Sequence, residues 1–169
     1  RTIQVTPSDV PVITSVTTEG SSIYGNTAIV NLSTANTGTY GFSIDNPDGP
    51  FQTGNQFNNI ACGVHKAYAS DNNGCGVVSQ SFEIIGIPIY FTPNGDGYED
   101  TWNVRCATAH PTITISLFDR FGKLLKQIAA GGSGWDGTIN GKGLPADDYW
   151  FIVQFDDGRI QKGHFALKR

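Results

Sequence analysis

Apolar and polar residues alternate in short runs along this chain, and no helical period persists for even three turns. In the first half, runs rich in β-branched or aromatic residues are bounded by Asn, Gly, Asp or Pro, as strands are. These runs are ITSVTT, TAIVNLS, TYGFSID, HKAYAS and VVSQSFEII. Between two of them, SDNNGCG indicates a hairpin turn, because Asn and Gly tolerate positive φ. Residues 1–86 are therefore predicted to form an immunoglobulin-like sandwich, with a half-barrel as the alternative.

The pattern changes at IIGIPIYFTPNGDG, where two prolines interrupt the strand-like runs and indicate a short stiff linker. Beyond it, TITISLFD alternates Ile113, Ile115 and Leu117 with Thr and Ser. DRFGK then turns the chain, LLKQI returns it, and DYWFIVQF and IQKGHFALKR follow as two further strands around DDGR. The fold class predicted is all-β, with two consecutive antiparallel β-sandwich domains at residues 1–86 and 87–169.

Composition narrows the classes of function. The chain has 169 residues with 38% hydrophobic and 15% charged side chains, and its net charge of −4 argues against a nucleic-acid binder, which normally carries a basic stripe. No apolar run reaches the roughly 20 residues that a membrane helix needs, so we expect no direct membrane insertion. The sequence starts at Arg1 and contains no methionine. We expect a fragment of a longer exported protein whose targeting segment lies upstream.

The segment FTPNGDGYEDTW is the densest group of polar side chains and could bind a cation. When the segment is aligned with an EF-type calcium loop, Thr92 and Asn103 occupy the first and last ligand positions. In an EF-type loop carboxylates at these positions are the strongest ligands, so two of the strongest ligands are missing here. A weak Ca²⁺ site would therefore use the remaining oxygens, from Asn94, Asp96, the Tyr98 carbonyl and Asp100. The alternative, which we favour, is an Asx-type turn in which these side chains bond their own backbone.

Other candidate chemistry does not assemble into a catalytic site. The acid pairs Asp147-Asp148 and Asp156-Asp157 stand in turn contexts rather than facing each other across a cleft. The three histidines lack metal-binding spacing, and GGSGW lacks the Gly-x-Ser-x-Gly of a nucleophile elbow. We therefore predict that the chain is not an enzyme and needs no cofactor.

Aromatic and cysteine residues each leave two interpretations. The aromatic side chains form either a carbohydrate platform or, as we favour, the core of a small sandwich; they are Phe91, Trp102, Trp135, Tyr149 and Trp150.

In an exported protein, three cysteines suggest one disulfide. Cys62 and Cys75 would lie at opposite ends of a hairpin strand, roughly 30 Å apart. Either that strand is shorter and bent, or Cys62 pairs with Cys106.

Four segments together resemble one family: FTPNGDGYEDTW, ISLFDRFGKLL, GWDGTINGKGLPADDYWFIV and DGRIQKGHFALKR. They are similar, in order, to the gliding-motility-associated C-terminal domain, the type B sorting domain of the Bacteroidetes type IX secretion system. The resemblance covers about residues 87–169. Departures are Glu99, the segment RCATAH, and Asp147 where glycine is usual. Upstream, GPFQTGNQFNNI and ASDNNGCG are similar to immunoglobulin-like repeats of large gliding adhesins such as SprB.

The resemblance implies an export address rather than an enzyme. It implies passage through the type IX translocon, a PorP/SprF-like outer-membrane β-barrel partner, and a final place at the cell surface. The alternative function is a calcium- or glycan-binding β-sandwich module of a secreted protein.

The basic last strand is the candidate partner contact, because an edge strand there could pair with a partner strand. Its charged residues are Arg159, Lys162, His164, Lys168 and Arg169. The alternative is that these charges only keep a sheet edge soluble.

Overall fold

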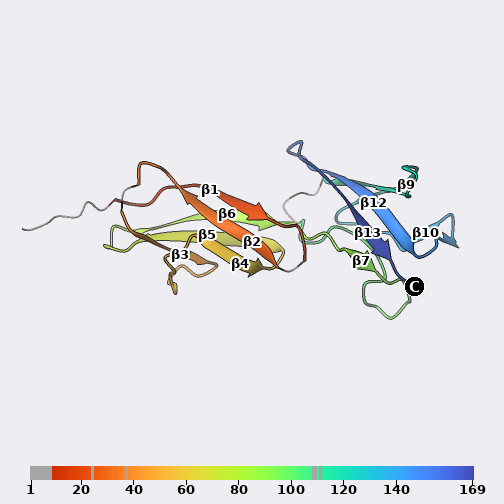
Figure 1. Ribbon diagram of the computed structural model, residues 1–169, viewed down its shortest axis with the longest axis horizontal. Coiled ribbons are helices and arrows are strands. Elements are labelled where there is room, and N and C mark those ends of the chain that lie inside the picture. Colours follow the sequence, from red (N-terminus) through yellow and green to blue (C-terminus); the bar gives the residue numbers. More distant parts are fainter. Residues whose placement is uncertain (1–8, 24, 37, 108–109, 111) are drawn as a thin grey trace, which may run out of the picture. The chain divides into compact units, whose positions relative to one another are not determined.

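Strands and loops make up the whole described chain, and the predicted all-β class is confirmed. The computed structural model describes residues 9–23, 25–36, 38–107, 110 and 112–169 (Figure 1). Within these residues no helix is present that could cross a membrane. The first unit ends at Ile84 and the second begins at Ile85, close to the boundary placed after residue 86 from sequence.

The first unit packs two antiparallel three-stranded sheets against each other. One sheet has the order β1 (Ile13–Glu19), β2 (Asn26–Leu32), β4 (Gln56–Ile60), and the other β3 (Tyr40–Ile44), β5 (Gly63–Asp71), β6 (Val77–Ile84). The chain crosses between the sheets after β2, β3 and β4, as it does in sandwich folds. Between the sheets lie Val30, Phe42, Ala67 and Ala69, so the predicted strand runs supply the core.

The length of strand β5 decides whether Cys62 can form a disulfide with Cys75. It has nine residues, and Cys62 precedes it while Cys75 follows it. An extended strand of this length separates its ends by about 30 Å, far beyond disulfide reach. A bridge between Cys62 and Cys75 is therefore excluded.

The second unit is built on a five-stranded sheet with the order β7-β13-β12-β8-β9. Its strands are β7 (Tyr90–Phe91), β8 (Thr114–Phe118), β9 (Leu124–Ala129), β12 (Asp147–Gln154) and β13 (Ile160–Leu167). Two strands of two residues each, β10 (Thr138–Ile139) and β11 (Lys142–Gly143), form a separate antiparallel hairpin. Figure 1 shows β12 and β13 side by side, with β7 next to the end of β13.

The position of the last strand differs from the sequence prediction. We expected β13 to be an edge strand, but β12 lies on one side of it and β7 pairs in parallel with Ala166 and Leu167 on the other. The parallel pair is also an exception to the predicted antiparallel arrangement. Most of the unit lies between β7 and β13 and provides the long connection that a parallel pair needs. Among the described strands, none covers this side of β13 before Ala166.

The inner face of this sheet buries a core of aromatic rings. Trp102 is fully buried and stacks on Phe165 with ring centroids 4.0 Å apart. Its backbone also exchanges hydrogen bonds of 2.8 and 2.9 Å with Trp135, so short bridges rather than a regular sheet cover this face. Of the aromatic residues that the sequence assigned to the core, Phe91, Trp102, Trp135 and Tyr149 are buried, whereas Trp150 is exposed and the core prediction is wrong for it. Leu117, Phe151, Val153 and Phe165 are buried in the same core.

Candidate functional site

The loop between β7 and Trp102 is organised by the Asp100 carboxylate. One of its oxygens accepts hydrogen bonds from the backbone N–H groups of Asn94 at 3.0 Å and Gly95 at 2.6 Å. The other oxygen accepts from the Gly97 N–H at 2.8 Å. Carboxylates that accept several backbone N–H bonds are stabilised in the charged form. These bonds, from Gly95 first and then Gly97, lower the pKa of Asp100 below its ordinary value.

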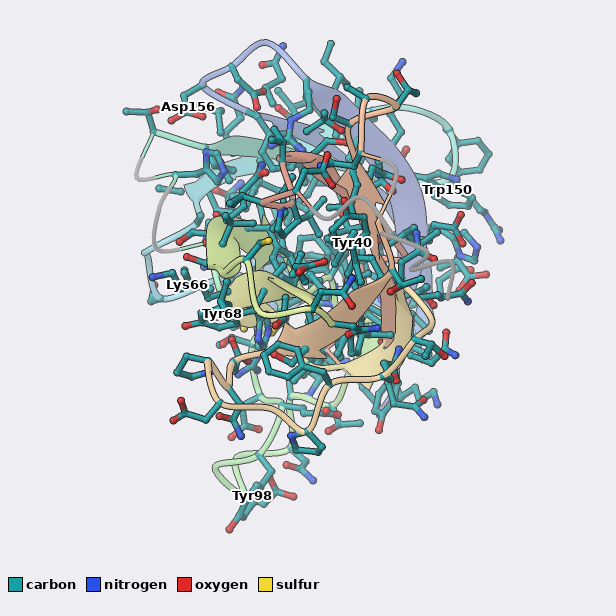
Figure 2. All side chains as sticks on the ribbon, turned by 90° about the vertical axis from the view of Figure 1, so that its left-hand side faces the viewer. Tyr40, Lys66, Tyr68, Tyr98, Trp150 and Asp156 are labelled. Carbon is teal, nitrogen blue, oxygen red and sulfur yellow. The ribbon has the colours of Figure 1, made fainter. Side chains whose placement is uncertain are left out.

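The other polar side chains of this loop bond within it as well. The Asn94 Oδ1 accepts from the Asp96 N–H at 3.0 Å, and the Asp96 Oδ1 accepts from the Tyr98 N–H at 2.8 Å. Both contacts are of the Asx-turn type. The Tyr98 side chain projects into solvent from the tip of the loop (Figure 2). Calcium binding by Asn94, Asp96, Tyr98 and Asp100 stays a prediction, and the side-chain oxygens of Asn94, Asp96 and Asp100 already accept backbone hydrogen bonds.

The aromatic candidates divide between the two faces of the sheet. Phe91, Trp102, Trp135 and Tyr149 are buried, as the core interpretation predicted, and cannot form a carbohydrate platform. Trp150 differs: it is 40% exposed and lies on the outside of the strands (Figure 2). It alternates with Tyr149 and Phe151, so it points to the opposite face of β12.

Three of the five basic candidates near the C-terminus have partners within their own unit. Arg159 pairs with Asp157 at 2.6 Å, and its guanidinium lies 4.7 Å from the Phe155 ring centroid. The Lys168 ammonium lies 4.2 Å from the centroid of the Tyr90 ring. The Arg169 Nε donates to the Leu144 carbonyl at 3.1 Å. Arg159 thus contacts the turn between β12 and β13, whereas Lys168 and Arg169 help to hold the end of the chain in place.

The other two basic candidates, Lys162 and His164, lie on the exposed outer face of β13. His164 is directly opposite Trp150 on β12, and their ring centroids are 6.2 Å apart. Lys162 is opposite Ile152 and lines an open hollow of about 430 Å³. The wall of this hollow also contains Phe118, Trp150 and Ile152, so the structure brings two predicted contact residues together with apolar side chains.

Sequence reasoning missed the apolar part of this outer face. Apolar residues occupy nearly every position of DYWFIVQF, which hides the phase of its two faces in the sequence. Tyr149, Phe151 and Val153 share the buried phase, whereas Trp150 and Ile152 fall in the other phase. Side chains of a strand alternate between its two faces with a period of two. This period would have separated the buried residues from the outer ones if the strand had been known to pack against the core with one face only.

Asp147, Asp156, Asp157 and His110 are engaged in structural contacts. Asp147 and Asp148 begin β12 rather than occupying a turn, so their side chains point to opposite faces of the sheet. Asp147 forms an ion pair with Arg120 at 3.3 Å. The Nδ1 atom of His110 lies 2.7 Å from an Asp156 oxygen. In the part of the chain that is described, no cluster of three or more His, Cys, Asp or Glu residues is suited to bind a metal.

A family model for the CHU_C type IX secretion signal domain matches residues 85–167. The second unit is a type IX secretion signal domain. The match spans β7 to β13, and therefore the whole five-stranded sheet and its aromatic core. The resemblance found in the four sequence segments is confirmed, and the chain is part of a protein exported by the type IX secretion system.

Solved structures resemble the chain only loosely. They include the BSP domain of a biofilm-associated protein (15% identity, TM-score 0.32, covering 86% of this chain and 27% of that one). Dimeric latent PorU from Porphyromonas gingivalis has 12% identity and a TM-score of 0.35, covering 93% and 20%. The Tp47 lipoprotein of Treponema pallidum has 12% identity and a TM-score of 0.32, covering 98% and 53%.

This chain thus spans from about a fifth to about half of these proteins, and TM-scores this low assign no function. No curated protein sequence matches the chain.

Proposed function

We propose that the chain is the C-terminal part of a non-enzymatic adhesin that the type IX translocon delivers to the cell surface. The family match of residues 85–167 carries this proposal, because it assigns a secretion signal to a unit with its own core. The adhesin role is supported by the similarity of the upstream segments to repeats of gliding adhesins. The partner proposed at the outer membrane is a PorP/SprF-like protein.

The architecture of the signal supports recognition of a folded domain rather than of a linear tail. Phe165 and Leu167 are buried in the sheet core, and Arg169 is bonded to the loop that follows β11. A receptor that bound these last residues as an extended peptide would have to pull a core strand out of the sheet. The signal is therefore the outer surface that the folded unit presents.

Surface delivery of a fused reporter tests this function. We would attach residues 85–169 to an inert periplasmic reporter with a signal peptide and express it in a bacterium with a type IX system. We expect the reporter to become accessible to added protease on intact cells. The same fusion should remain in the periplasm of a strain that lacks the translocon.

Two further fusions serve as controls. Residues 1–84 in place of residues 85–169 should leave the reporter in the periplasm, because the family match lies outside this segment. Trp102→Ala should abolish export, because it removes the centre of the aromatic core. Periplasmic retention of a folded wild-type fusion would contradict the proposed function.

A further inference from the structure

The outer face of the second unit carries a row of large side chains that crosses four neighbouring strands. The strand register places Leu124 opposite Phe118, Phe118 opposite Trp150, and Trp150 opposite His164. Residues directly opposite one another have Cβ atoms about 5 Å apart, so their side chains form one continuous surface. We call Leu124, Phe118, Trp150 and His164 the outer row.

The outer row does not contribute to the core, which lies on the other side of the sheet. Trp150 is 40% exposed and Leu124 is 50% exposed. Phe121, in the turn that joins β8 to β9, is 84% exposed. Single exposed apolar residues are ordinary, but a contiguous group with a tryptophan at its centre is typical of protein contact surfaces.

A hollow and a cation lie directly beside the outer row. The hollow of about 430 Å³ is lined by Phe118, Trp150, Ile152 and Lys162, a volume large enough for an apolar side chain. Within the described residues, the Lys162 ammonium has no ion-pair partner. Asp119 and Arg120 also line the hollow. The Asp119 carboxylate accepts the N–H groups of Phe121 and Lys123, and Arg120 pairs with Asp147 at 3.3 Å. Lys162 is therefore the lining cation that a ligand carboxylate could pair with.

Backbone groups next to this surface are also available. The N–H groups of Ala166 and Lys168 donate to the carbonyls of Ile89 and Phe91, at 2.9 and 3.0 Å. Because strand groups alternate with a period of two, the N–H and C=O groups of His164 and Lys162 face the same side. Among the described strands, none pairs with that side of β13 at these two positions. An extended segment could add there as a strand.

We propose that the outer row and its hollow form the surface by which a protein of the export machinery recognises this domain. The matching partner segment is extended, places an apolar side chain against Trp150 in the hollow, and places a carboxylate at Lys162. Aliphatic side chains from Leu124 and Ile152 and free backbone groups on β13 fit a protein segment better than a glycan. This inference rests on the proposed export function and assigns a surface to it.

The test uses the whole chain fused to the reporter, so that export and recognition are read separately. Trp150→Ser should reduce the surface-exposed reporter roughly tenfold, the loss expected when a central interface tryptophan is removed. Lys162→Glu should also reduce export, and Lys162→Arg should retain it. Tyr98→Ser is the matched control, because Tyr98 is a 79% exposed aromatic residue away from the outer row. We expect Tyr98→Ser to be exported normally.

Folding of each purified variant is checked by circular dichroism and thermal unfolding. Trp150→Ser should unfold near the wild-type temperature, since its side chain lies outside the core. The double variant Leu124→Ser/Phe121→Ser is a second probe that leaves both Trp150 and the core in place. Its reduced export would support the proposal even if Trp150→Ser failed to fold.

Normal export of folded Trp150→Ser and of the double variant would overturn the inference while leaving the export function intact. Failure of the wild-type fusion to reach the surface would overturn both. If the folded Trp150→Ser variant is exported normally but loses binding to purified outer-membrane polysaccharide, the hollow is a glycan site and the proposal is wrong.

Discussion

Asp100 holds its own loop together by accepting backbone hydrogen bonds, a structural role that differs from the role of a metal ligand. Its two carboxylate oxygens accept three backbone N–H groups, from Asn94, Gly95 and Gly97. Only a short acidic side chain reaches all three from this position, and the charge strengthens each bond. The glycines supply the positive φ angles that turn the backbone toward the carboxylate, 78° at Gly95 and 89° at Gly97.

Stability should depend on pH through Asp100 in a defined direction. Its pKa in the folded chain is lowered below the ordinary 3.8, so the carboxylate form stabilises the folded loop. This contribution is fully present above the ordinary value and is lost as the pH falls through the lowered pKa. We expect Asp100→Asn to lower the melting temperature at pH 7, and the difference from wild type to shrink below pH 4. Asp148→Asn, which changes an exposed acid outside the loop, should show no such trend.

Calcium should have little effect on the same loop. The oxygens of Asn94, Asp96 and Asp100 already accept backbone hydrogen bonds, and a cation would have to compete with these donors. We expect the melting temperature to be the same in millimolar Ca²⁺ and in EDTA. If the melting temperature of the wild type rises in Ca²⁺ and that of Asp96→Ala does not, the metal site is established instead.

Residue-level burial could be predicted where one face of a strand had a clear period. Ile113, Ile115 and Leu117 alternate with polar residues in the sequence and are all buried. Trp150 could not be placed in this way, because apolar residues occupy both faces of its strand. The hydrogen bonds of Asp100 were also beyond reach, since they depend on the path of the loop backbone rather than on the order of side chains.

At the scale of elements, β13 serves the core with one face and the outer row with the other. Phe165 points inward and His164 outward, and Gly163 lies opposite Phe151 on β12. A Cβ atom at Gly163 would come within 2.6 Å of the Phe151 ring. The glycine therefore leaves the space that the ring of Phe151 occupies in the core.

Filling this space should destabilise the second unit. Overpacking a well-packed core typically costs about 1–3 kcal/mol. We expect Gly163→Val to lower the melting temperature of the chain by several degrees, roughly 4–8 °C per kcal/mol for a domain of this size. His164→Val, on the same strand but facing solvent, should change it little. Equal effects of the two substitutions would show that strand propensity rather than the Phe151 contact decides stability.

Most of the longer elements were predictable, β4 (QFNNI) being an exception because its run is mainly polar, and the shortest were not. β5, β6, β8, β12 and β13 each have at least five residues, enough for a period to show in the sequence. β7, β10 and β11 have two residues each, too few for any period. Missing β7 led to the expectation that β13 is an edge strand, whereas β7 pairs with its last two residues, Ala166 and Leu167.

At the scale of the whole molecule, each unit has a separate hydrophobic core. The core of the second unit is formed from residues between Ile85 and Leu167, and that of the first from residues between Ile13 and Phe82. All three tryptophans, Trp102, Trp135 and Trp150, belong to the second unit. Tryptophan emission therefore reports on the secretion signal domain alone.

A secretion signal that serves different cargo proteins must fold without help from any of them, and the second unit meets this requirement from its own residues. We expect residues 85–169, expressed alone, to unfold in a single cooperative transition followed by tryptophan fluorescence in urea. Trp102→Ala in this fragment should remove the transition, because truncating a buried tryptophan costs about 3–5 kcal/mol and a domain of this size is marginally stable. Residues 1–84 should show no tryptophan signal and should unfold cooperatively by circular dichroism. If residues 85–169 lack a cooperative transition while the full chain has one, the domain depends on its upstream neighbour. A folded outer surface could not then serve as an export signal on an unrelated cargo.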